Sequence, residues 1–515
     1  MTRQLPVALA ATVASGMLYA LAFPPLRIRP LAWVALVPFF VVLRDAAWGR
    51  RLALGVFWTL VSGWSVGTWM PSAVATYFDQ PFLVGVALFL IVTGCMAAPY
   101  YAAAAVAYAP LTRFGAATPL LVGAAWAAAE LARGRLLNGT LTYVGNSPWA
   151  TLGYSQTGFT PLVQIAAVTG VYGVSFVVAA VNAGLAEIAA RLLVGRTVGQ
   201  TTWVGAGLAF GAAVLAIGGG AFVVARNDVA RGEPVPIAIV QGNLGAAVRW
   251  SAEGPSRTLE TYQRLTRDAL TDNMPRIVLW PEAALTSFVE QDEIMRHSLA
   301  LTVDGHDAEL VIGAPRAGGA GGAAPYTNSV YLVGTDGTLG ARYDKQYLLP
   351  FMEYFPLRLE WARRHFGRVR EFSPGAATPP LPTRAGAAGL LICNEAFLPH
   401  VASARVAGGA TYLVSPSNDS WVPDAGFAWQ QFEIAAMRAV EQRRYVIRVS
   451  DSGPSGVVDP FGRIVAHTEP LERAVLQTTV APITERSLYG RVGDLFGVAC
   501  ALVTAAALAL SIRRR

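Results

Sequence analysis

Charged residues are scarce in this chain of 515 residues. Asp, Glu, Lys and Arg make up 14% of it, whereas roughly 25% is usual in a soluble domain. Hydrophobic residues make up 54%, and such a chain cannot cover itself with polar groups, so we expect an integral membrane protein. The net charge of +7 comes from Arg residues spread along the chain. Because no basic run is interleaved with aromatic residues, the pattern argues against a nucleic-acid partner.

Cysteine and lysine are rarer still. Of the three cysteines, Cys95 and Cys500 fall in apolar stretches, which leaves Cys393 without a disulfide partner in its own domain. Lys345 is the only lysine among 40 basic residues. Chance survival would explain it, but so would a site that needs a compact ammonium, because a planar guanidinium cannot replace one. We favour the second explanation.

Apolar segments separated by short loops fill residues 1–224. We expect them at about 6–23, 31–43, 52–70, 82–108, 116–133, 160–191 and 202–224. Most reach the roughly 20 residues that cross a bilayer, whereas 31–43 is short enough to be tilted or re-entrant. The first resembles a signal peptide in length, but Pro24-Pro25 is a poor cleavage site, so we expect a retained helix. Residues 1–224 therefore predict a transmembrane bundle of about seven helices.

An eighth apolar segment, about 493–512, precedes Arg513-Arg514-Arg515. Residues 491–515 are thus expected to form a C-terminal transmembrane helix with an Arg-rich cytoplasmic tail. With the N-terminus inside, the cytoplasmic loops hold more Arg than the outer loops. Seven crossings would then place residues 225–490 on the periplasmic side of a bacterial inner membrane.

Residues 225–490 have a different pattern. Short β-rich apolar runs alternate with helical stretches at about 256–271 and 428–443. The expected strands are 236–241, 276–280, 310–314, 329–333, 389–393, 412–415 and 445–449. Near-continuous apolar strands interleaved with helices predict an α/β domain whose sheets are buried on both faces.

Three reactive side chains lie at strand ends in this domain: Glu282 and Cys393 end apolar strands, and Lys345 lies in a polar turn after a strand. Strand ends are where α/β folds deliver reactive groups. A buried carboxylate can take the proton of a thiol, and an ammonium can stabilise the oxyanion that follows thiol attack. Together they suit acyl transfer through a thioester. A Cys-His scheme with His400 is the weaker alternative, and each residue alone could be structural.

The sequence around these residues resembles the nitrilase, or carbon–nitrogen hydrolase, superfamily. The three matching blocks are Trp280-Pro281-Glu282, Tyr343-Asp344-Lys345 continuing to Pro350, and Cys393-Asn394-Glu395. One branch, the apolipoprotein N-acyltransferases, is also resembled at 240–243, 349–356, 417–421 and 459–463, and in the apolar half at 126–130, 133–134 and 153–156. The resemblance implies a multi-pass α-helical membrane bundle plus an α/β nitrilase-like αββα sandwich domain with a Glu-Lys-Cys triad.

The resemblance also implies the reaction. A membrane phospholipid would donate an acyl chain to the N-terminal amine of the S-diacylglyceryl cysteine of an apolipoprotein, in the last step of lipoprotein maturation. Glu282 would be the base and Cys393 the nucleophile. Lys345, with a backbone N–H near Asn394, would hold the oxyanion, and Glu353 would orient Lys345.

Further residues are assigned more loosely. Glu395 is either a support for the site or a substrate contact. Tyr354 and Trp421 are candidates to line the acyl path, and the aromatic segments 351–361 and 421–429 are candidate lids. The chain has Asn394 where the family often has an aromatic residue, and Met352 where Gly is usual, which bears on substrate fit. No metal or nucleotide motif appears, so no cofactor is implied, and we expect a monomer.

Two alternatives stay open. A membrane-tethered amidase or nitrilase would use the same triad, with water in place of the amine, on a small carbon–nitrogen substrate. A transporter or lipid-binding scaffold would not need the triad. Apart from Glu130, the expected spans carry almost no ionisable residues, which argues against a transport pathway.

Overall fold

The computed structural model describes residues 4–136, 148–227, 232–245, 248, 251, 253–270, 276–318, 324–350, 352–354 and 372–513. The chain divides into two compact units. A helical unit comprises Met1–Asn138, Asn146–Asn227 and Val492–Arg515. A sheet unit comprises Gly139–Gly145 and Asp228–Arg491.

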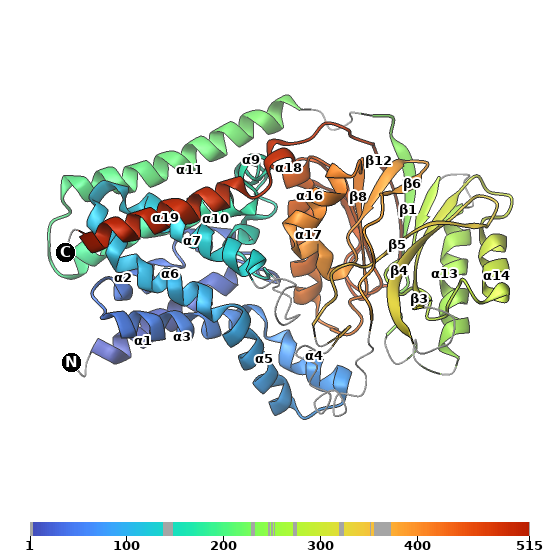
Figure 1. The fold of residues 1–515 in the computed structure, drawn as a ribbon, viewed down its shortest axis with the longest axis horizontal. Helices are drawn as coiled ribbons and strands as arrows, with labels where there is room; N and C mark the ends of the chain where they lie inside the picture. Colours follow the sequence, from blue (N-terminus) through green and yellow to red (C-terminus); the bar gives the residue numbers. More distant parts are fainter. Residues whose placement is uncertain are drawn as a thin grey trace. The chain divides into compact units, whose positions relative to one another are not determined.

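The helical unit is built from apolar helices joined by short turns. Its helices are α1 (Gln4–Leu21), α2 (Val37–Arg44), α3 (Trp48–Val66), α4 (Trp69–Phe78), α5 (Phe82–Met96), α6 (Ala98–Leu111), α7 (Thr118–Arg135), α8 (Thr160–Val163), α9 (Ala166–Thr169), α10 (Val171–Leu193), α11 (Gln200–Arg226) and α19 (Leu495–Arg513). The C-terminal helix α19 lies alongside α7 and α10 (Figure 1). The last apolar segment of the chain therefore packs with the earlier ones in one bundle.

Four helices within the described residues are long and apolar enough to cross a bilayer. They are Ala98–Arg135, Val171–Leu193, Gln200–Arg226 and Leu495–Arg513. A fifth span would be the pair α3 and α4, which is bent by 66°. Helix α2 has eight residues and, at 1.5 Å per residue, is too short to span a membrane.

Two segments expected as single helices are broken, so those predictions were wrong. The segment 82–108 breaks at Ala97, because Pro99 lacks the N–H that a continuous helix needs and stands at the start of α6. The segment 160–191 breaks at Gly170, whose φ of 67° lies outside the helical region. Arg514 and Arg515, expected to form the cytoplasmic tail, lie outside the described residues.

Buried polar groups within the bundle bond to one another. Glu130 Oε1 accepts hydrogen bonds from Trp126 Nε1 at 3.0 Å and from the Leu152 backbone N–H at 2.8 Å. Asn182 Nδ2 donates to the Ala32 carbonyl at 2.9 Å. The bonds between Glu130 and Leu152 and between Asn182 and Ala32 join segments far apart in the chain. Glu130 therefore has a structural partner set of its own.

In the sheet unit, the described residues form two six-stranded sheets, ordered β12-β1-β2-β3-β4-β5 and β11-β10-β9-β8-β7-β6. The strands are β1 (Val235–Gln241), β2 (Ile277–Leu279), β3 (Glu309–Gly318), β4 (Ala324–Val333), β5 (Leu339–Asp344), β6 (Leu381–Thr383), β7 (Gly386–Leu390), β8 (Tyr412–Ser417), β9 (Val446–Ser450), β10 (Gly456–Val458), β11 (Ile464–His467) and β12 (Ala474–Val480). β1, β2 and β3 are parallel in the first sheet, as are β7, β8 and β9 in the second.

Helices cover the outer face of each sheet (Figure 1). α13 (Gly254–Leu270) and α14 (Glu293–Val303) pack on the first sheet, and α16 (Pro399–Ala407) and α17 (Ala425–Gln442) pack on the second. The inner faces share a core that includes Ile239 and Ile447. The layers run helix, sheet, sheet, helix, so the expected αββα sandwich is confirmed.

One expected strand ends early. The run 389–393 is a strand only as far as Leu390, and Cys393 instead begins the 3-10 helix η5 (Cys393–Phe397). Apolar Leu391 and Ile392 extend the pattern that the sequence presents, but the backbone has already left the sheet. The nucleophile candidate therefore lies on a turn beyond the strand.

Close packing between α3 and α6 depends on Gly55. A Cβ there would lie 2.6 Å from the Ala102 Cα and 2.9 Å from the Ala105 Cβ, and small residues permit such approach between membrane helices. We expect Gly55→Leu to destabilise the detergent-solubilised protein by about 2 kcal/mol or more, measured as a lower melting temperature. Gly94→Leu is the matched control, since a Cβ at Gly94 meets nothing within 4 Å. Equal melting temperatures for the two variants would contradict the packing argument.

Candidate active site

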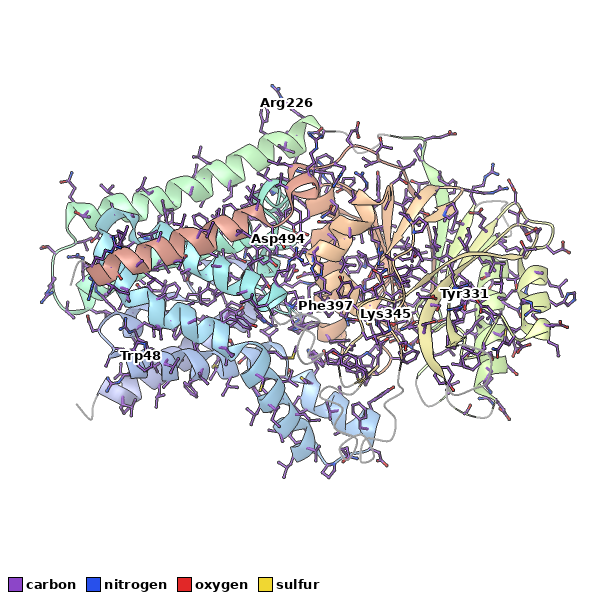
Figure 2. The ribbon with its side chains drawn as sticks, in the orientation of Figure 1. Trp48, Arg226, Tyr331, Lys345, Phe397 and Asp494 are labelled. Atoms are coloured by element: carbon purple, nitrogen blue, oxygen red, sulfur yellow. The ribbon has the colours of Figure 1, made fainter. Side chains whose placement is uncertain are left out.

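The candidate site lies where strand ends of the two sheets meet. Glu282 follows β2 and Lys345 follows β5 in the first sheet, while Cys393 follows β7 in the second. Lys345, labelled in Figure 2, lies in the interior of the sheet unit with 1% of its surface exposed. A buried ammonium is stable only with partners of opposite charge.

Two carboxylates supply those partners. Lys345 Nζ lies 2.8 Å from Glu353 Oε2 and 3.4 Å from Glu282 Oε1. Burial by itself would lower the pKa of Lys345, but the charges of Glu353 and Glu282 outweigh it and raise that pKa above its usual value. Lys345 is therefore an ammonium at neutral pH.

Asn328, on β4, bridges the two carboxylates. Its Nδ2 donates to Glu282 Oε1 at 2.7 Å and to Glu353 Oε1 at 2.9 Å. The Leu349 backbone N–H adds a bond to Glu353 Oε2 at 2.7 Å. Sequence reasoning missed Asn328, and the only signal for it was a polar residue immediately before the apolar run 329–333.

Glu282 is held from the second sheet as well. Its Oε2 accepts the Asn418 backbone N–H at 2.9 Å. Burial raises the pKa of Glu282 despite the attraction of Lys345, so this carboxylate holds a proton more readily than an exposed glutamate. Its turn packs tightly on β3, because a Cβ at Gly313 would lie 2.3 Å from the Pro281 carbonyl oxygen.

Cys393 is buried and has a φ of 51°. A left-handed conformation costs a non-glycine residue about 1–3 kcal/mol and persists only where the surroundings enforce it. Burial raises the pKa of the Cys393 thiol, and the charge of Glu282 raises it further, against the opposing effect of Lys345. The thiol is therefore protonated at rest and needs a base at the moment of attack.

Glu395 joins the loop after Lys345 to the turn before Cys393. Its carboxylate oxygens accept hydrogen bonds from Tyr343 Oη at 2.7 Å, Gln346 N at 2.8 Å, Tyr347 N at 3.1 Å and Ile392 N at 2.8 Å. Burial raises the pKa of Glu395. Its oxygens are bonded to these protein donors, and its role as a support for the site or as a substrate contact stays a prediction.

Three further residues predicted for the site, Asn394, Trp421 and Tyr354, have contacts in the structure that do not demonstrate a role. Asn394 Nδ2 donates to the Tyr347 carbonyl at 3.1 Å. Trp421 packs edge-on against Phe427, with ring centroids 5.4 Å apart. Tyr354 forms an isolated β-bridge with Pro350. Their parts in oxyanion or acyl-chain binding stay predictions, and 351 and 355–361 of the expected lid lie outside the described residues.

Two further expectations bear on the chemistry. The ring of His400 packs edge-on against Tyr347, with centroids 5.4 Å apart, whereas the charges acting on the Cys393 thiol include those of Glu282 and Lys345.

Within the part of the chain that the structure describes, no group of three or more His, Cys, Asp or Glu side chains is placed to hold a metal ion. The site thus offers acid–base and nucleophilic groups.

Comparison with models of known protein families identifies the class of this protein. Residues 236–488 match the family model described as carbon-nitrogen hydrolase, in agreement with the two sheets and their strand-end residues. Residues 15–184 match the apolipoprotein N-acyltransferase N-terminal domain. Among solved structures, a carbon-nitrogen hydrolase from Helicobacter pylori G27 is similar with a TM-score of 0.39 and 18% identity, over 51% of this chain and 94% of that chain.

Curated relatives extend over nearly the whole chain. An apolipoprotein N-acyltransferase from Geobacter metallireducens is 32% identical over 98% of this chain and 95% of its own. One from Ralstonia nicotianae is 31% identical over 97% and 92%, and one from Pseudomonas aeruginosa is 29% identical over 97% and 96%. The chain belongs to the apolipoprotein N-acyltransferase family, and the resemblance seen in the sequence is confirmed.

The geometry predicts a strict need for lysine at position 345. Lys345→Arg keeps the charge, but a guanidinium does not fit the buried space between Glu282 and Glu353. We expect turnover to fall at least about 100-fold, as when an oxyanion donor is lost, measured with the full-length protein in vesicles. Arg342→Lys, a cation exchange at a partly buried position on β5, the strand that precedes Lys345, is the control and should stay active. Near-normal turnover in Lys345→Arg would contradict the prediction.

Proposed function

We propose that this chain transfers an acyl chain from a membrane phospholipid to the N-terminal amine of the S-diacylglyceryl cysteine of an apolipoprotein, through a thioester on Cys393. The observation that carries the proposal is a buried ammonium between two carboxylates, electrostatically coupled to a thiol. Membership of the acyltransferase family and the apolar helical unit support the choice of a lipid donor and a lipoprotein acceptor over a small amide.

In the first half-reaction, Glu282 takes the proton of the Cys393 thiol as sulfur attacks an ester carbonyl of the phospholipid. The developing oxyanion is stabilised by Lys345 and a backbone N–H near Asn394. The carbon–oxygen bond of the ester then breaks. The leaving alkoxide takes the proton from Glu282 and departs as lysophospholipid, while the acyl chain remains on sulfur.

In the second half-reaction, the lipoprotein amine attacks the thioester carbonyl. Glu282 accepts the proton that the amine loses, and Lys345 again holds the oxyanion. Cleavage of the carbon–sulfur bond gives an amide, and the thiolate recovers its proton from Glu282. Two substrates that share one covalent intermediate give ping-pong kinetics.

The helical unit gives this chemistry a physical setting. Moving an acyl chain from lipid into water costs about 0.8 kcal/mol per methylene, so a soluble enzyme would have to overcome that cost for both substrates. We infer that residues 225–490 form the catalytic domain on the outer side of the inner membrane, with the N- and C-termini in the cytoplasm, and that the protein acts as a monomer. The excess of Arg in the loops assigned to the cytoplasm supports this orientation.

An acyl-enzyme trap tests the nucleophile. Incubation of the purified protein with phospholipid labelled in its acyl chain should leave label on the protein that neutral hydroxylamine removes. Cys393→Ala should form none, whereas Cys95→Ala should label normally. Label retained in Cys393→Ala would reject the nucleophile, and release of ammonia from small amides without any phospholipid requirement would favour the amidase alternative.

The pH dependence tests the base. Glu282 acts as a base only when ionised, and burial raises its pKa. The rate of acyl-enzyme formation should therefore fall as the pH drops through that raised pKa, at a pH above the roughly 4.3 of an ordinary glutamate. Glu282→Gln should lose at least about 100-fold in rate at the plateau. We call this fall of the rate at low pH the acid limb of the profile. An acid limb at or below the pKa of an ordinary glutamate would contradict the assignment.

A further inference from the structure

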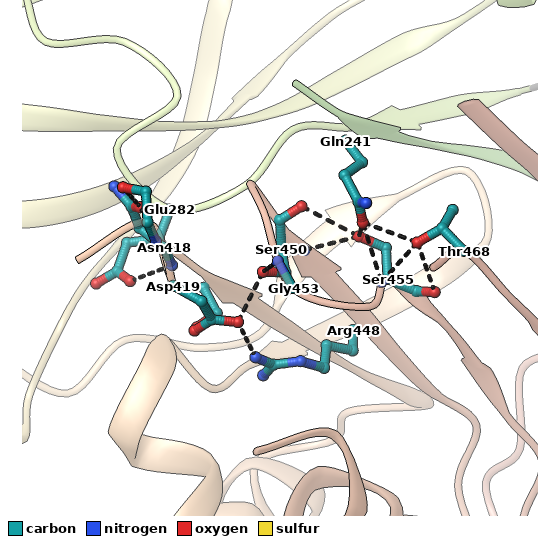
Figure 3. Close-up of polar contacts among 11 residues, drawn as sticks. Gln241, Glu282, Asn418, Asp419, Arg448, Ser450, Gly453, Ser455 and Thr468 are labelled. Atoms are coloured by element: carbon teal, nitrogen blue, oxygen red, sulfur yellow. Dashed lines mark hydrogen bonds and ion pairs between the residues drawn. The ribbon is translucent and has the colours of Figure 1, made fainter. Parts of the chain in front are cut away.

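A second buried polar cluster lies beside the site, on the neighbouring parallel strands β8 and β9 (Figure 3). Asp419 stands at its centre. Arg448 Nη2 donates to Asp419 Oδ2 at 2.5 Å, Ser450 Oγ donates to the same oxygen at 2.8 Å, and Ser417 Oγ donates to Oδ1 at 2.8 Å. We name Ser417, Asp419, Arg448 and Ser450 the Asp419 clamp. Its side chains are almost completely buried.

Stability alone is a poor reason for this clamp. Burying an ion pair costs desolvation free energy, which the attraction between the charges offsets only in good geometry. Apolar residues of similar size often stabilise a protein just as much. Asp419 and Arg448 are each 1% exposed. We infer that this pair instead supplies a fixed conformation for the backbone that carries it.

The backbone that the clamp fixes is the turn after β8. Asn418 lies between the clamp residues Ser417 and Asp419, and its backbone N–H is the donor to Glu282 Oε2 (Figure 3). The space around the Asp419 carboxylate is also closed: a Cβ at Gly453 would lie 2.4 Å from Asp419 Oδ2. A shift of Asp419 would therefore move the donor that holds Glu282.

We propose that Asp419 and Arg448 are positioning residues for Glu282. The ion pair holds the turn after β8 so that the Asn418 N–H stays bonded to Glu282 Oε2, which keeps the carboxylate ionised and in place. This inference rests on the proposed function, in which Glu282 is the base. It assigns no contact with substrate to either member of the pair.

The direction of the expected change separates this role from a plain charge effect. The charged groups that face Glu282 are Lys345 and Glu353, with the Cys393 thiol beside them. Removing the negative charge of Asp419 would, by electrostatics alone, make nearby protons easier to lose. Losing the Asn418 hydrogen bond does the opposite, because that bond lowers the pKa of Glu282.

The experiment compares rate–pH profiles of acyl-enzyme formation in the full-length protein. Asp419→Asn removes the charge in an isosteric way, and Gly453→Ala keeps both charges but displaces the carboxylate. Both should move the acid limb upward by about one pH unit, the equivalent of one hydrogen bond to a carboxylate. Thr468→Val is the control: it removes a buried hydroxyl that bonds to Gln241 Oε1 at 2.8 Å in the adjoining network, and its limb should match wild type.

An unmoved or lowered acid limb in either folded variant would overturn the inference while leaving the proposed function intact. If neither variant folds, Ser450→Ala, which removes one clamp hydroxyl and no charge, should give a smaller upward shift, and an unchanged limb there would overturn it too. Failure of the wild type to form an acyl-enzyme would instead remove the proposed function and this inference with it.

Discussion

Lys345 can remain charged in the interior only because the carboxylates of Glu282 and Glu353 lie within 3.4 Å of its Nζ. Burial raises the pKa of the neighbouring Cys393 thiol, and the negative charge of Glu282 raises it further against the opposing charge of Lys345, so the thiol rests in its protonated form. Burial likewise raises the pKa of Glu282 despite the attraction of Lys345, so this carboxylate accepts a proton more readily than an exposed glutamate. Burial and the charges around one ammonium together set the resting state of the other groups.

This cluster joins the two sheets of the sandwich. Glu282, Asn328 and Lys345 come from the first sheet, whereas Cys393 and the Asn418 N–H come from the second. Glu395 makes the same connection through backbone bonds, since it follows β7 and bonds to the loop after β5. The apolar core between the sheets therefore also sets the spacing of the reactive groups.

Sequence reasoning identified what has a local signature. Glu282 and Cys393 each end an apolar run, Lys345 is the only lysine of the chain, and all three lie in recognisable blocks. The parallel strands are apolar because both faces are buried. Asn328 and Arg448 could not be found this way, since their meaning comes from partners distant in the chain. β12 was missed because most of its residues are partly or fully exposed, so it lacks the continuous apolar run of a buried strand. Hydropathy alone did not reveal the breaks at Ala97 and Gly170.

The burial of Lys345 has a consequence for the surface of the protein. With the only ε-amine of the chain 1% exposed, a folded copy presents arginines but no lysine to its surroundings. Guanidinium groups are protonated at any physiological pH and poor nucleophiles. In the proposed reaction, the acyl group on Cys393 would therefore meet no exposed lysine on a neighbouring copy, and would be kept for the intended acceptor rather than lost to self-modification.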